Sequence, residues 1–368
     1  MIHQQALSSP IDDSGDNTQP SNGPPNQPSS EYGGSPEGCT GLVHGQVTAF
    51  DDTGEVAQLA NTGGVAGGVL PVDVGLSTNG QSLAMIANGG VTAANALDVV
   101  STDGCTTQLS GGQFIADRAV AVQFDGAGDL VTQYRQPSRI EVHSGVDTSM
   151  KRAIVLGSDD RTDTGFELFH GDPDNFGMGI ACASCHPEGG DDGHVWRFQI
   201  EGARRTMSLA GDVTQRAPFH WKGDLKDFSA LMDEVFTKRM GGLPQDAQRK
   251  EVLSSYVALF PSLPTVSGLD PNAVARGKSL FESQDTGCTA CHSGSQLTTK
   301  AIVDVGTGGP FKVPSLLGLG LRAPYLHDGS AATLADRFGP AGGGDNHGHT
   351  SQLSTAQVSD LVSYLTSL

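Results

Sequence analysis

The chain has 368 residues, enough for two or three domains of typical size, with 41 acidic against 22 basic residues. Its formal net charge of −19 argues against a nucleic-acid or anionic-membrane surface and favours cationic or neutral partners. No apolar run approaches the roughly 20 residues that cross a bilayer, so we expect no membrane span.

The first 40 residues have the composition of a linker. Positions 8–38 are rich in Pro, Ser, Gly, Asn and Gln and hold almost no apolar side chains. Such a stretch cannot bury enough surface to fold, so we expect a disordered tether over residues 1–40. The opening residues lack the basic region and apolar core of a secretory signal. Any signal peptide is therefore expected to have been removed or to lie outside this chain.

Residues 41–150 have the pattern of β-hairpins. The runs VDVGLSTNGQSLAMIA, from Val72, and VAVQFDGAGDLVTQYR, from Val120, each alternate apolar and polar residues around a glycine-containing turn. A similar strand and turn begin at His44. Hairpins that recur in this way are typical of propeller blades, although a closed propeller needs at least about four. The sequence predicts a small β module that is partly propeller-like.

From residue 151 the periodicity becomes helical, and the proline-rich segment 260–271 joins two such units. The run 225–240 places its apolar residues on one helical face. The run 354–368 does the same behind a capping box at Ser354 and Gln357. The predicted fold is mixed, with two mainly α, cytochrome c-like haem domains at 151–263 and 264–368 after a β module at 41–150.

Two copies of Cys-x-x-Cys-His, CASCH at 182–186 and CTACH at 288–292, hold four of the six cysteines. Two thiols three positions apart can add to the two vinyl groups of one porphyrin, and the next histidine then reaches the iron. A zinc site would leave the paired histidines unexplained, and a dithiol redox site needs a βαβ setting. The motifs predict two covalently bound c-type haems, held by Cys182, Cys185 and His186 and by Cys288, Cys291 and His292.

The two remaining cysteines, Cys39 and Cys105, form an even pair that suits a disulfide. A disulfide indicates an oxidising compartment, and we therefore expect a periplasmic or extracellular protein. Two unpaired buried thiols are the alternative.

Several segments resemble one family. KVPSLLGLGL (312–321) and APYLHDGSAATLADRF (323–338) resemble the C-terminal haem domain of bacterial di-haem cytochrome c peroxidases and their MauG-like relatives. GHVWRFQIEGARRTMSL (193–209), followed by PFHWKGDLKDF (218–228), resembles their N-terminal haem domain. The resemblance covers about residues 160–368, and a propeller-like segment ahead of it resembles a known fused arrangement.

The resemblance implies a peroxidase-type oxidoreductase. Family members reduce hydrogen peroxide, or use it to oxidise a protein, at the first haem, while the second haem accepts electrons from a small donor protein. Such chemistry needs an iron with an open or openable sixth position and a polar residue to manage protons. The expected partners are hydrogen peroxide or a partner protein and an electron donor.

The resemblance also suggests roles for single residues. His194 matches a distal histidine that leaves on activation, or else is an exposed loop residue. Trp221 matches an aromatic residue between the two haems, or else is a core residue. Arg204 and Arg205 are candidates to pair with haem propionates, because a planar guanidinium binds a carboxylate through two hydrogen bonds.

The chain departs from the family at a catalytic acid. The peroxidases place a glutamate just before a Met-Gly pair, where this chain has Arg239 before Met240. Asp233 and Glu234 lie one or two turns earlier, and Glu234 is our candidate for the acid.

Two further departures concern ligands. No methionine follows Met240, so the second haem lacks the usual thioether, and His347 is the expected substitute, ahead of His349. Tyr325 is a further oxygen ligand candidate. Arg205 stands where the peroxidases often have an asparagine at a calcium site, which leaves calcium possible but unsupported.

These departures keep a second function open. If His194 and His347 both bind iron permanently, neither haem has an open position, and the protein is an electron-transfer cytochrome without peroxide chemistry. A MauG-like protein that oxidises a bound partner is a third possibility, and a scaffold with unused haems ranks last.

Overall fold

A computed structural model describes residues 2–6, 10–11, 13, 42–48, 53–54, 63–65, 70–87, 90–95, 105–106, 115–116, 119–147, 149–157, 163–171 and 180–368. The chain divides into two compact units. Unit 1 comprises residues 1–9, 16–184 and 235–244, and unit 2 comprises residues 10–15, 185–234 and 245–368. The expected domain limits at 150 and 263 stay a prediction. Among the described residues, no helix has the length and apolar character needed to cross a membrane.

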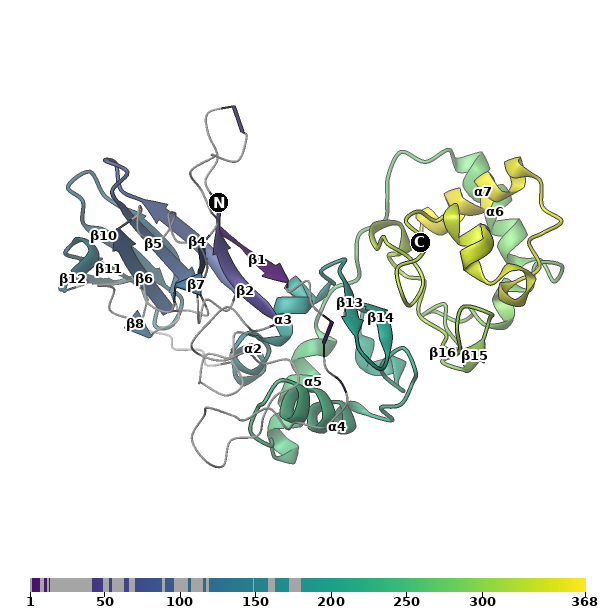
Figure 1. Cartoon of the computed structure of the whole chain (residues 1–368), viewed down its shortest axis with the longest axis horizontal. Coiled ribbons are helices and arrows are strands. Elements are labelled where there is room, and N and C mark those ends of the chain that lie inside the picture. Colours follow the sequence, from purple (N-terminus) through teal and green to yellow (C-terminus); the bar gives the residue numbers. More distant parts are fainter. Residues whose placement is uncertain are drawn as a thin grey trace. The chain divides into compact units, whose positions relative to one another are not determined.

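Among the described residues, unit 1 contains three four-stranded sheets, whose strands are drawn as purple to blue arrows in Figure 1. The first sheet has the order β1 (Ile2–Ala6), β2 (Val43–Val47), β3 (Gly63–Val65) and β7 (Cys105–Thr106). The second has the order β4 (Pro71–Leu76), β5 (Ser82–Ala87), β6 (Gly90–Asn95) and β8 (Ile115–Ala116). The third is the meander β9 (Ala119–Phe124), β10 (Leu130–Tyr134), β11 (Arg139–His143) and β12 (Met150–Val155).

The repeated hairpins of the sequence are confirmed as β4–β5 and β9–β10, both antiparallel. The second turn shows why these residues reverse the chain. The Asp125 carboxylate accepts hydrogen bonds from the N–H groups of Ala127 and Asp129, and Gly128 takes a φ of 84°. The inward faces form one apolar core that includes Ile86, Leu130 and Tyr134. Whether these sheets are propeller blades stays a prediction.

The first sheet corrects one expectation. Ile2–Ala6, which we assigned to the disordered tether, form β1 and pair with β2 in an antiparallel register. Composition missed this strand because an edge strand is held by backbone hydrogen bonds and needs few apolar side chains. Cys105 begins β7, but Cys39 lies outside the described residues, so the disulfide stays a prediction.

Unit 2 carries most of the described helices and two small hairpins, β13–β14 and β15–β16. The helix α2 (Thr164–His170) belongs to unit 1, and α3 (Cys182–Cys185) leads from unit 1 into unit 2. The elements that follow are β13 (Val195–Phe198), β14 (Gly202–Arg205), α4 (Phe228–Leu231), the π-helical η4 (Met232–Arg239), α5 (Ala247–Ala258), α6 (Pro271–Glu282), β15 (Ile302–Asp304), β16 (Pro310–Lys312) and α7 (Thr355–Thr366).

The helices α6 and α7 lie side by side in Figure 1 and share one apolar core with Phe281 and Leu361. Gly277 allows this close approach, because a Cβ there would overlap the carbonyl oxygen of Asp360. The capping box at Ser354 is confirmed at the start of α7. The expected helix at 225–240 starts later, at Phe228, because the Asp227 side chain accepts from the Ala230 N–H and ends the extended segment.

Candidate haem-binding sites

The first Cys-x-x-Cys-His motif forms a single helical turn. Both cysteines lie on α3 and His186 follows directly. The His186 Nδ1 lies 3.4 Å from the carbonyl oxygen of Gly190. A carbonyl can only accept, so Nδ1 carries the proton and Nε2 is available to a metal. Burial lowers the pKa of His186 and raises the pKa of the Cys182 thiol to about 12, which keeps both groups neutral.

The second motif repeats this local arrangement. Cys288 begins a short 3-10 turn, and the His292 N–H donates to its carbonyl oxygen at 2.9 Å. The His292 Nδ1 lies 3.2 Å from the carbonyl oxygen of Leu297, which again leaves Nε2 available. Burial, together with the nearby Arg337, lowers the pKa of His292 to about 4, so the imidazole is neutral at physiological pH.

The imidazole of His347 faces that of His292. Their ring centroids are 6.4 Å apart and their planes differ by 34°. Two imidazoles on one metal ion need a centroid separation of about 6 Å, since each metal–nitrogen bond is about 2 Å long. The His347 Nδ1 lies 3.1 Å from the Gly342 carbonyl oxygen, and burial lowers its pKa to about 3. The pair therefore has the spacing and the protonation state of two axial ligands.

A cavity in unit 2 surrounds this pair. Its wall combines the second motif with Trp221, apolar side chains such as Phe281 and Leu316, and a few basic groups. The thiols, two facing imidazoles and an apolar wall match what a covalently attached haem needs. The residues present fit the group.

Trp221 lies on the wall of this cavity and is fixed at both ends. Its indole N–H donates to the carbonyl oxygen of Arg205 at 2.7 Å, and its own carbonyl oxygen accepts from the Lys312 N–H at 2.7 Å. Its ring meets the His327 ring edge-on, with centroids 6.3 Å apart. The hydrogen bond to Arg205 ties Trp221 to the segment that follows the first motif.

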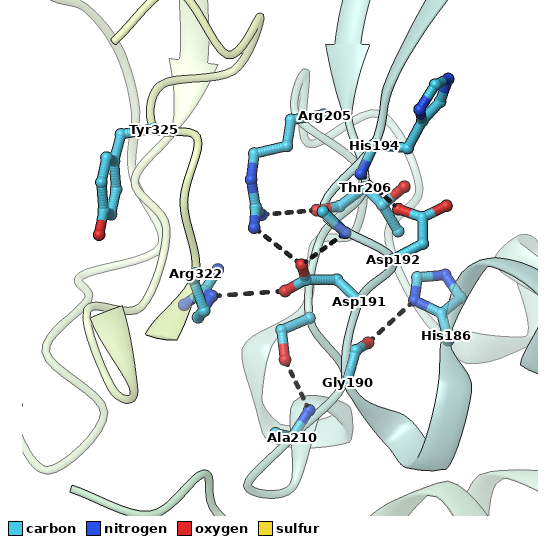
Figure 2. Close-up of polar contacts among 12 residues, drawn as sticks. His186, Gly190, Asp191, Asp192, His194, Arg205, Thr206, Ala210, Arg322 and Tyr325 are labelled. Atoms are coloured by element: carbon cyan, nitrogen blue, oxygen red, sulfur yellow. Dashed lines mark hydrogen bonds and ion pairs between the residues drawn. The ribbon is translucent and has the colours of Figure 1, made fainter. Parts of the chain in front are cut away.

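Asp191 lies between two arginines, Arg205 and Arg322, as Figure 2 shows. The Arg205 Nη2 donates to Oδ1 at 2.8 Å, and the Arg322 Nε lies 3.8 Å from Oδ2. All three side chains are buried. Asp191 follows Gly190, whose carbonyl oxygen accepts from His186, the candidate ligand of the first haem. The dipeptide Gly190–Asp191 therefore contacts both His186 and the arginines that line the second cavity.

Other candidate residues lie elsewhere. Arg204 pairs with Glu201 at 3.6 Å and stacks over Phe311, and it is not a wall residue of the cavity. The His194 ring is exposed, lies against Trp196 and points away from His186 in Figure 2. Tyr325 lines the cavity but donates its hydroxyl to the Leu319 carbonyl oxygen at 3.2 Å.

Glu234 is half-buried on η4, whereas its neighbour Asp233 is exposed and pairs with Lys250 at 2.6 Å. The ligand role of His194 and the acid role of Glu234 stay predictions. The described residues hold no group of three His, Cys, Asp or Glu side chains that could bind a cation. At Arg205 two guanidinium groups surround the carboxylate, an environment that disfavours calcium.

Sequence reasoning missed three basic residues of the second cavity. Arg322 and Lys312 line it beside Arg205, and Arg337 donates from Nη2 to the carbonyl oxygen of His347. Lys312 and Arg337 lie in the two C-terminal segments that resemble the peroxidase family, and Arg322 lies between those segments. The sequence therefore points to this region, but only the folded structure shows that these basic side chains are buried.

Comparison with known proteins agrees with this geometry. The family model described as cytochrome c matches residues 274–368, which include the second motif. Hydrazine synthase subunit gamma of Kuenenia stuttgartiensis is 27% identical over 254 residues, which are 51% of this chain and 72% of the relative. Cytochrome c551 peroxidase of Nitrosomonas europaea is 26% identical over 250 residues, 50% of this chain and 73% of the relative.

A solved structure of the hydrazine synthase of Kuenenia stuttgartiensis contains a similar chain. The similarity covers 57% of this protein and 89% of the hydrazine synthase chain. Its TM-score is 0.50 at 21% identity, which supports the fold. The protein is thus a cytochrome with c-type haem, of the haem oxidoreductase class. Its similarity to these relatives supports a MauG-like and di-haem peroxidase-like family.

Proposed function

We propose that this protein is a di-haem peroxidase-type oxidoreductase. Cys182 and Cys185 would anchor one haem with His186 as its ligand, and Cys288 and Cys291 the other with His292 and His347. A bound haem supplies reversible one-electron transfer and, where a coordination position is open, a site for peroxide.

The difference between the two motifs carries the proposal. His347 faces His292 at the distance of a ligand pair, whereas no imidazole in the continuously described segment 180–368 faces His186 in this way. A pair of strong ligands favours electron transfer at the second motif, and an open position favours peroxide chemistry at the first. Reduction of peroxide to water consumes two electrons and two protons, so a relay and a proton donor are both required.

Trp221 suits the relay, because it lies on the second cavity and its indole N–H is bonded to the Arg205 carbonyl. Glu234 and His194 are the candidates to hold and deliver protons at the first site. The donor is a small protein of neutral or positive charge, because the chain carries a net charge of −19. We place the protein in the periplasm or outside the cell, where c-type haem is attached.

The test begins with the EPR and optical spectra of the full-length protein, oxidised and half-reduced, with its haem content. The proposal expects two haems per chain, one low-spin and one that becomes high-spin or exchangeable on half-reduction. Addition of hydrogen peroxide with a reduced donor then causes donor oxidation.

Two low-spin haems that remain inert to peroxide after half-reduction would leave an electron-transfer cytochrome. Oxidation of a bound protein in place of the donor would point to the MauG-like reaction.

A further inference from the structure

Three basic side chains meet on the wall of the second cavity. Arg205, Arg322 and Lys312, which we call the cationic wall, all line it. They are only 4%, 9% and 4% exposed. A buried charge costs several kcal/mol unless an opposite charge meets it, so the wall requires anionic partners.

Asp191 is the one carboxylate that pairs with the wall within residues 180–368. It lies within 2.8 Å of an Arg205 nitrogen and 3.8 Å of an Arg322 nitrogen. A single carboxylate balances one of the three cations. Two positive charges therefore lack a counter-charge in that part of the chain, although the whole chain is strongly acidic.

Several donors of the wall are also unused. The buried Nε of Arg205 has no hydrogen-bond partner among the described residues. The Lys312 amine forms no hydrogen bond or ion pair within residues 180–368, although its backbone N–H is bonded to the Trp221 carbonyl. Arg216 adds a further positive charge near Lys312; its guanidinium donates to Gln296 and to the Gly211 carbonyl oxygen, and Asp212 is its acidic neighbour.

We propose that the cationic wall is a site for two carboxylates, and that it binds the two propionate groups of the haem held by Cys288 and Cys291. This inference rests on the proposed function, since it needs a haem at the second motif. Two carboxylates neutralise the two uncompensated charges and accept from the unused donors. Asp191 holds the two guanidinium groups in place, and Lys312 supplies a positive charge that no carboxylate within residues 180–368 pairs with.

The assignment has a consequence for the relay. The indole N–H of Trp221 donates to the main-chain oxygen of Arg205, and the Trp221 carbonyl oxygen accepts from the main-chain N–H of Lys312. Residues of the wall would thus hold both the indole and the carboxylate edge of a bound haem. A positive charge at this edge favours the reduced state of the haem, because reduction adds one negative charge.

The test compares Lys312→Met with Lys278→Met in the full-length, haem-loaded protein. Both changes remove one lysine charge, but Lys278 is exposed on α6 and does not line the cavity. The measurements are haem content, the midpoint potential of each haem by spectroelectrochemistry, and the propionate bending bands in the resonance Raman spectrum. We expect Lys312→Met to lower the potential of the His292 haem and to shift its propionate band, and Lys278→Met to change neither. Lys312→Arg, which keeps the charge, should retain the potential.

Equal effects of the two methionine variants would overturn the inference, as would a potential that depends on added inorganic phosphate with an unchanged propionate band. A single haem per chain would contradict the proposed function itself. Two haems with an unchanged propionate band in Lys312→Met would overturn only the carboxylate site.

Discussion

Arg337 donates a hydrogen bond from Nη2 to the main-chain oxygen of His347, and the imidazole of His347 faces His292. A second hydrogen bond, from His347 Nδ1 to the Gly342 carbonyl oxygen, fixes the ring. The loop thus delivers a neutral imidazole to the second cavity with two anchors, one on its backbone and one on its ring.

Replacement of this histidine should open the second haem. We expect His347→Ala to convert the C-terminal haem from low-spin to high-spin, since a strong axial ligand is lost. EPR and the optical spectrum measure the change. His349→Ala is the matched control, because His349 is exposed and lies two residues further along the same loop. A spin change in the His349 variant alone would contradict the ligand assignment.

Trp221 should govern the rate of peroxide reduction. We expect Trp221→Phe to slow turnover about tenfold, equivalent to about 1.4 kcal/mol in the barrier, because the indole and its bond to Arg205 are lost. Steady-state donor oxidation measures the effect.

The chain offers one other tryptophan as a control. Trp196 is buried and donates its indole N–H to the Thr206 hydroxyl at 3.0 Å, so Trp196→Phe removes a similar group and a similar hydrogen bond. If the two phenylalanine variants lose turnover equally, the relay role of Trp221 is wrong.

Removal of the carboxylate between the two arginines should destabilise unit 2. Asp191→Asn leaves Arg205 and Arg322 buried without their counter-charge, and we expect a loss of about 3 kcal/mol in the free energy of unfolding. Urea unfolding followed by circular dichroism measures the loss. Asp192→Asn, at the exposed neighbouring position, should cost less than about 1 kcal/mol. Comparable losses in both variants would show that the ion pairs of Asp191 with Arg205 and Arg322 do not stabilise unit 2.

The potential of the second haem should depend on pH. Burial, with Arg216 and Lys300 nearby, lowers the pKa of Lys312 to about 8. Protonated Lys312 favours the reduced haem, so the midpoint potential should fall as pH rises through this pKa and stay flat well below it. Carboxylates bound at the wall would move the fall to higher pH.

Spectroelectrochemical titration between pH 6 and about pH 10 measures this dependence. Lys312→Arg, which stays charged throughout the range, should lose the dependence. A slope near pH 8 that persists in the arginine variant would assign the titration to another group. His327 could not be that group, because burial lowers its pKa from the usual value.

The sequence by itself determined the local chemistry of this protein. The spacing of Cys182, Cys185 and His186 follows from one helical turn, and the capping box at Ser354 joins groups three residues apart. The two hairpins follow from alternation and from turn residues such as Asp125. Each of these features forms between residues that are close in the sequence, so the local residue types are enough to predict it.

Only the tertiary structure decided which distant residues meet. His347 and His349 lie two residues apart in one loop, and the hydrogen bonds of that loop determine that the His347 ring faces His292. Arg204 and Arg205 are adjacent, yet alternation along β14 sends one toward Glu201 and the other toward Asp191. Arg322 and Lys312 lie more than a hundred residues after Arg205 in the chain, and folding brings them to the same cavity wall. The balance of buried charge is set there. That balance is a property of the folded chain, because water screens the same charges when the chain is unfolded.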